Sequence, residues 1–171
     1  MFSPDQLVVY PAQGVGRIER IEHRNIGGVT AEFYLVRILG NNITLMVPVD
    51  SSNSIGLRQL STPSEGQAVM TDLQDRTAFT GHTGQNWNRR HREYTERLKK
   101  GSLADVAYVL KDLILISGEK ELSFGERRLL EQSMDLLTRE LSFVFDQSNE
   151  NIRADIEVLF SDILTKKEKM E

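Results

Sequence analysis

The sequence of 171 residues has no cysteine, four prolines, three histidines and a single tryptophan. Without cysteine the chain has neither disulfides nor thiolate metal ligands, which fits a reducing compartment. The histidines lie at 23, 82 and 91, without the close spacing of a zinc site. No run approaches the roughly 20 apolar residues that span a bilayer, and no secretory signal opens the chain. We expect a cytoplasmic protein without membrane contact, metal or other cofactor.

Catalytic motifs are also missing. The sequence has no phosphate-binding loop, dinucleotide fingerprint or nucleophile elbow, because Gly14-Val15-Gly16 is followed by Arg17 and the glycine pattern stops there. Carboxylate pairs are uninformative in a chain with 27% charged residues. The sequence predicts that the protein is not an enzyme. A cleft with convergent titratable groups would overturn this expectation.

The charge is unevenly distributed along a chain whose net charge is −4. Residues 81–128 carry ten Lys and Arg against seven Asp and Glu, whereas residues 1–80 carry six against eight and residues 129–171 carry five against ten. Charges beyond a Debye length of about 8 Å are largely screened, so a basic face on an acidic protein can still attract phosphate. We expect weak DNA binding that depends on a second partner.

The hydrophobic pattern changes once, near residue 60. Before that point, short β-rich runs such as 7–10, 33–39 and 43–49 alternate with turns containing Gly and Asn, which predicts a small five-stranded antiparallel barrel. From residue 61 the pattern is helical. We therefore predict an α+β protein with a β domain over 1–60 and an all-α domain of about five helices over 61–171.

Capping residues mark the expected helices. Ser64 is a candidate cap for a helix over about 65–75, and a loop with Gly81 and Gly84 precedes a helix from Trp87 to Lys100. Ser102 and Ser123 have the spacing to acidic residues that opens the next two helices. A last helix is expected over about 149–165.

Trp87 stands at the head of the basic segment Asn86-Trp87-Asn88-Arg89-Arg90-His91-Arg92-Glu93-Tyr94. Arginine forks bind phosphate oxygens, and an aromatic ring stacks on bases or wedges between them. The alternative is that Trp87 belongs to the core, on one face with Tyr94 and Leu98. Its position in a first helical turn after a glycine-bearing loop favours an exposed indole. Expected DNA contacts are Trp87, Arg89, Arg90, Arg92 and Arg97, with Arg127 and Arg128 as a weaker second element at another helix start.

The β domain offers a different kind of surface. A sheet edge can accept a partner's strand by β-augmentation, and Pro48 marks an edge because proline cannot donate to a ladder. Val36 and Ile38, or Met46 and Pro48, are candidate docking residues. The alternative that Met46 is packed inside stays open.

Three segments together resemble the CarD/CdnL family of bacterial transcription regulators. Residues 7–16, LVVYPAQGVG, are similar to the opening V-V-Y-P-x-x-G-x-G of the family. Residues 87–94, WNRRHREY, resemble its W-x-R-R-x-R segment, and residues 122–130, LSFGERRLL, its L-S-x-G-E-[KR] helix start. The segments occur in the family's order, and the resemblance covers roughly residues 5–163.

The resemblance implies a Tudor-like (SH3-like) barrel that docks on the RNA polymerase β subunit, with Arg24 at the position of a polymerase-contacting arginine. Some relatives carry a further arginine where this chain has Met46. It also implies a helical domain at the upstream edge of the promoter bubble, with Trp87 as a minor-groove wedge and Arg89 and Arg90 on the DNA backbone. We expect a monomer that stabilises the open complex with little sequence readout. The rival hypothesis is an adaptor that recruits a second protein to polymerase through Trp87.

Overall fold

The computed structural model describes residues 1–77 and 86–168, the last two of these in backbone only. The expected loop glycines at 81 and 84, and the histidine at 82, lie outside the described residues. The chain divides into two compact units, Met1–Leu60 and Ser61–Glu171. They are called the N-terminal unit and the helical unit below.

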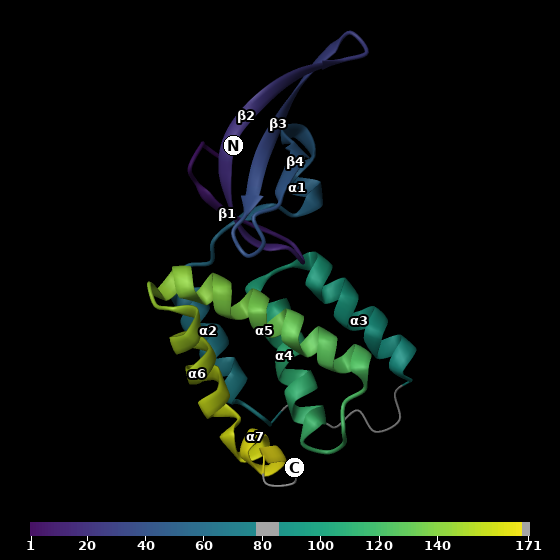
Figure 1. Ribbon diagram of the computed structural model, residues 1–171, viewed down its shortest axis with the longest axis vertical. Coiled ribbons are helices and arrows are strands. Elements are labelled where there is room, and N and C mark those ends of the chain that lie inside the picture. The colour runs from purple at the N-terminus through teal and green to yellow at the C-terminus, as the bar shows by residue number, and fades with distance from the viewer. Residues whose placement is uncertain (78–85, 169–171) are drawn as a thin grey trace. The chain divides into compact units, whose positions relative to one another are not determined.

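The N-terminal unit is a five-stranded antiparallel sheet, as the sequence predicts (Figure 1). The strand order is β4-β3-β2-β1-β5, so β4 and β5 form the two edges. A 3₁₀ turn, η1, and a one-turn helix, α1, connect β4 to β5. The strands are β1 Leu7–Tyr10, β2 Gly14–Ile26, β3 Val29–Ile38, β4 Thr44–Pro48 and β5 Arg58–Gln59, with η1 at Val49–Ser51 and α1 at Ser52–Ile55.

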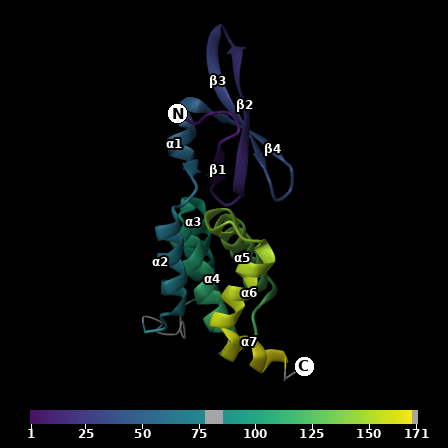
Figure 2. The same cartoon turned by 90° about the vertical axis from the view of Figure 1, so that its left-hand side faces the viewer.

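Local chemistry explains the shape of this sheet. Gly27 and Gly28 turn β2 into β3 with positive φ angles of 59° and 86°, a conformation that glycine adopts without strain. The paired ends of β2 and β3 extend beyond the other strands as a long hairpin (Figures 1 and 2). A Cβ on Gly16 would lie 2.7 Å from Cγ1 of Val36, so glycine is required where β2 passes β3.

The core of the sheet corrects one prediction. Val36 and Ile38 on β3 are 0% and 1% exposed, and they pack with Val8, Ile18 and Tyr34. The prediction that Val36 and Ile38 form a docking surface is therefore wrong. Strand β3 is rich in β-branched and aromatic residues because its inner face fills the core. It is paired on both sides, by β2 and β4.

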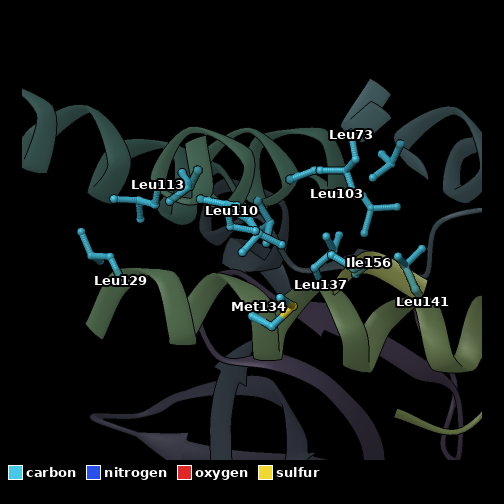
Figure 3. Packing of buried hydrophobic residues seen from close by; sticks show 14 of the residues in the cluster. Leu73, Leu103, Leu110, Leu113, Leu129, Met134, Leu137, Leu141 and Ile156 are labelled. Atoms are coloured by element: carbon cyan, nitrogen blue, oxygen red, sulfur yellow. The ribbon is translucent and has the colours of Figure 1, made fainter. Parts of the chain in front are cut away.

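The helical unit is built around α4, a helix apolar on most of its circumference. Residues of α4 such as Leu110 and Leu113 meet Leu129, Met134 and others from α5 (Figure 3). Helices α2, α3 and α5 each pack on α4, as the views in Figures 1 and 2 show. The helices are α2 Pro63–Gln74, α3 Trp87–Lys100, α4 Leu103–Ser117, α5 Phe124–Phe145, α6 Asn149–Leu159 and α7 Ser161–Glu168.

Two helix boundaries differ from the predicted ones. Thr62, not Ser64, caps α2: its hydroxyl accepts from the Glu65 N–H while the Glu65 side chain accepts from the Thr62 N–H. Pro63 then occupies the first helical position, which suits a residue without an N–H. The expected last helix is two helices, because the backbone leaves the helical conformation at the buried Phe160.

Candidate nucleic-acid interface

Helix α3 starts where the sequence predicts. The side chain of Asn86 accepts a hydrogen bond of 3.0 Å from the Asn88 N–H, so Trp87 is the first helical residue. Gly101 ends the helix in the left-handed conformation. Tyr94 and Leu98, which share a face with Trp87, are 1% and 3% exposed and belong to the core.

Trp87 lies at the rim of that core. Its indole is half-buried and packs against the buried cluster of the helical unit. A Cβ on Gly125 would lie 3.3 Å from Cζ2 of the indole, so the ring rests on the first turn of α5. The His91 ring meets it edge to face, with the ring centroids 5.3 Å apart. The expectation of an exposed indole is therefore corrected in part: one part of the ring is packed and the rest faces solvent.

Arg90 is not placed to contact phosphate. Its side chain is 5% exposed, and Nη1 and Nη2 donate hydrogen bonds of 3.2 and 3.1 Å to Oε2 of Glu126, which is 2% exposed. The guanidinium also lies 5.2 Å from the centre of the Trp87 ring, a cation–π distance. The prediction that Arg90 holds the DNA backbone is wrong for this structure, because α5 already supplies its anion.

Glu126 joins several groups at the start of α5. Its Oε1 accepts from Lys120 Nζ at 2.9 Å and from the Ser123 N–H at 3.0 Å, while the Ser123 hydroxyl accepts from the Glu126 N–H. Burial alone raises the pKa of Glu126, but hydrogen bonds from Lys120, Ser123 and Arg90 outweigh burial and lower it to about 2. Burial lowers the pKa of Arg90, and the neighbouring Tyr94 hydroxyl and Glu126 carboxylate more than reverse that effect. Both partners of the Arg90–Glu126 pair are charged at neutral pH.

The other predicted arginines divide into two groups. Arg89 and Arg92 on α3, and Arg127 and Arg128 near the start of α5, have exposed side chains. Arg97 is half-buried instead: it pairs with Asp105 at 3.1 Å and Glu93 at 3.5 Å, and its guanidinium lies 3.7 Å from the Tyr108 ring centre. At Arg97 these internal partners compete with phosphate. Four of the predicted arginines remain exposed, on α3 and near the start of α5.

Sequence reasoning missed the contributions of the first turn of α5. Phe124, its first residue, is 75% exposed, an uncommon position for a phenylalanine side chain. Gly125 supports the indole, and Glu126 neutralises Arg90. The capping-box spacing of Ser123 and Glu126 indicates a helix start, but nothing local to that motif reports which residues of α3 it meets.

The predicted polymerase-contacting residues of the N-terminal unit differ in exposure. Met46 is 40% exposed and Pro48 half-buried, both on the edge strand β4. Arg24 is exposed near the hairpin tip, where Nε and Nη2 donate to Oε2 of Glu22 at 3.2 and 3.1 Å. The same carboxylate group receives Arg20 on its other oxygen. The edge strand β4, and the arginines 20 and 24 that pair with Glu22, are both compatible with docking on a partner protein.

Among residues 1–77 and 86–168, no group of three or more His, Cys, Asp and Glu is placed to hold a metal ion. No helix in the described part of the chain is long and apolar enough to cross a bilayer.

Comparisons with known proteins agree with the resemblance seen in the sequence. A family model for the C-terminal domain of CarD matches residues 68–157, and a model for the CarD-like/TRCF RID domain matches residues 2–61. The chain belongs to the CarD family. It is 26% identical over 156 residues to a Bacillus subtilis (strain 168) protein named "Putative transcription factor YdeB", a match that covers 90% of this chain and 99% of that protein.

One solved structure is also similar in sequence to part of this chain. It is named "CdnLNt from Myxoccoccus xanthus" and is 41% identical to this chain. The match covers 34% of this chain and 83% of that chain, with a TM-score of 0.31.

Proposed function

We propose that the protein is a transcription regulator that docks on the RNA polymerase β subunit through its N-terminal unit and stabilises the open promoter complex through its helical unit. Trp87 is the wedge at the upstream edge of the bubble, in the minor groove. Arg89, Arg92, Arg127 and Arg128 bind the DNA backbone without strong sequence preference. The protein acts as a monomer, which its mass in solution would test.

The observation that carries this proposal is the half-buried indole at the start of α3, together with exposed arginines on α3 and near the start of α5, the helix on which the indole rests. A wedge must be apolar, partly accessible and rigidly held, because unstacking a base step costs a few kcal/mol. The packed edge of Trp87 against Gly125 supplies the rigidity. The first turns of α3 and α5 add N–H groups and helix dipoles that favour phosphate.

Docking of the N-terminal unit is supported by the position of β4. An edge strand has backbone groups on one side that a partner strand can pair with. The partly exposed side chain of Met46 adds an apolar contact on this strand. Tethering through such a contact raises the effective concentration of the helical unit at the promoter to about millimolar, which makes a weak DNA contact sufficient.

The deciding experiment compares wild-type protein with Trp87→Ala on preformed polymerase–promoter complexes. We expect equal binding to polymerase and an open-complex lifetime shortened by at least about fivefold, the lower limit for loss of one stacked aromatic. Phe143→Ala is the matched control, since Phe143 is a partly exposed aromatic elsewhere on the helical unit. Equal lifetimes with wild-type and Trp87→Ala protein would exclude the wedge.

The exposed Phe124 favours a second candidate function. Together with Trp87 it gives the starts of α3 and α5 an apolar character that also suits a protein partner. In this alternative the N-terminal unit binds polymerase and the helical unit recruits another protein. A photo-crosslinker at position 87 in a promoter complex separates the two: crosslinks to DNA support the wedge, and crosslinks to protein alone support the adaptor.

A further inference from the structure

The contacts of Trp87 come from two helices that are distant in sequence. Arg90 follows Trp87 by one helical turn, so both side chains lie on the same side of α3. Gly125 and Glu126 belong to α5, and they meet the indole and the guanidinium respectively. The orientation of the ring is thus fixed by α3 and α5 together.

Glu126 is the group through which α5 acts. Both of its oxygens are engaged: Oε2 receives two N–H groups of Arg90, and Oε1 receives Lys120 and the Ser123 N–H. One carboxylate therefore fixes the first turn of α5 and the guanidinium at once. Because Gly125 precedes Glu126, fixing that turn also fixes the backbone on which the indole rests.

Stability alone is a weak reason for such an arrangement. A buried ion pair is seldom more stabilising than apolar side chains of similar volume, because both charges lose their hydration. The cost is visible here, since Nε of Arg90 is buried without a hydrogen-bond partner among the described residues. A directional, charged contact does provide one defined geometry, which preorganised sites need.

We propose that Glu126 is a positioning residue for Trp87: it holds the Arg90 guanidinium against the indole and so fixes the ring in the orientation that enters DNA. This inference rests on the proposed wedge function for its consequence at promoters. It predicts that loss of the Glu126 charge loosens the ring even though Glu126 itself touches no DNA. Gly125 serves the same end sterically, because any Cβ there presses on Cζ2.

The test uses the full-length chain and its only tryptophan as the probe. Glu126→Gln keeps the size of the side chain and the capping-box hydrogen bond but removes the charge that binds Arg90. We expect red-shifted Trp87 emission, stronger quenching by acrylamide, and an open-complex lifetime close to that of Trp87→Ala. Polymerase binding should be unchanged. Unaltered emission and quenching in folded Glu126→Gln protein would overturn the proposal.

Two further variants separate positioning from stability. Leu137→Ala creates a cavity in the core of the helical unit, more than three turns along α5 from Gly125, and should lower the melting temperature without changing quenching. If it changed quenching as Glu126→Gln does, the effect would be one of stability and the inference would fall. Gly125→Ala leaves the ion pair intact and pushes on the ring at 3.3 Å. It should alter the emission even if Glu126→Gln does not fold. Unaltered emission would show that the indole does not rest on α5, and the proposal would then lose the surface against which Glu126 holds the ring.

The promoter assay distinguishes failure of this inference from failure of the proposed function. If wild-type protein does not prolong open complexes, the wedge function fails, while the quenching experiments still decide whether Glu126 orients Trp87. If wild-type protein prolongs open complexes and Trp87→Ala does not, but folded Glu126→Gln equals wild type, only the positioning role is wrong.

Discussion

Replacing Arg90 by methionine separates a structural arginine from a DNA-contacting one. Methionine keeps an apolar stem of similar length and removes the charge. Glu126, 2% exposed, then keeps only Lys120 as a charged partner. Breaking a buried pair from one side leaves a buried charge without its full compensation, which is strongly destabilising.

The expected loss can be worked out from the structure. Removing one partner of a buried pair costs about 3–5 kcal/mol, and we expect about 3 kcal/mol because Lys120 still neutralises Glu126 in part. Arg90 is one of the donors, after Lys120 and Ser123, that hold the pKa of Glu126 below its ordinary value, so its removal should also raise that pKa. For a helical unit of roughly 110 residues, with about 2.1 cal/mol/K of unfolding entropy per residue, the melting temperature falls by about 13 °C.

Thermal and urea unfolding of the full-length chain, followed by circular dichroism and Trp87 fluorescence, measures this loss. Arg89→Met is the matched control, because Arg89 is an exposed neighbour on α3 and should change stability by no more than about 0.5 kcal/mol. The double variant Arg90→Met with Glu126→Leu should recover most of the loss, since no buried charge remains. If Arg90→Met proves as stable as Arg89→Met, the pair does not hold the two helices as described.

Two further predictions concern pH and docking. Because the folded-state pKa of Glu126 lies below its ordinary value, the stability that wild type has over Glu126→Gln should be complete above about pH 4.5 and vanish as pH falls toward 2; a pH-independent difference in the free energy of unfolding would contradict this. Met46→Asp should weaken binding to the polymerase β subunit by placing a charge on the edge strand β4. Val158→Asp, at an exposed apolar residue of α6 outside the N-terminal unit, should not, and calorimetry would show whether the two variants differ.

Local signals in the sequence account for most of the fold. Gly27 and Gly28 in the hairpin turn, and the caps Ser102 and Ser123, act within a few residues, so their effects can be predicted without tertiary structure. The same locality explains why the prediction of a single last helix over 149–165 is wrong. The apolar periodicity continues through Phe160, but α6 ends before this residue. The Phe160 side chain packs in the core, and the Arg76 guanidinium lies 5.4 Å from the centre of its ring.

The candidate site was harder to predict because it is assembled by long-range contacts. Arg89 and Arg90 are adjacent in the sequence and chemically identical, yet Arg89 is exposed whereas Arg90 is buried, at 5% exposure. The difference comes from Glu126, 36 residues away. Trp87 is likewise intermediate between the two sequence interpretations, core and solvent, because one part of its ring packs on Gly125 of α5 and the rest faces solvent.

The internal pairing of Arg90 and Arg97 limits how strongly the helical unit can bind DNA. Of the seven predicted DNA-contacting residues, Arg89, Arg92, Arg127 and Arg128 remain as exposed cations, and each phosphate contact contributes about 0.9 to the salt dependence of binding. We expect a slope no steeper than about −3.6 for the part of promoter-complex stabilisation that depends on this protein, shallower by about 1.8 in Arg89→Ala with Arg127→Ala. Lys166→Ala, at an exposed cation on α7, is the control and should leave the slope unchanged.

Four contacts cannot give tight binding on a chain of net charge −4, so the full-length protein without polymerase should bind promoter duplex only weakly at physiological salt. Tight binding under those conditions, or a slope that the double substitution leaves untouched, would show that other surfaces carry the DNA contact.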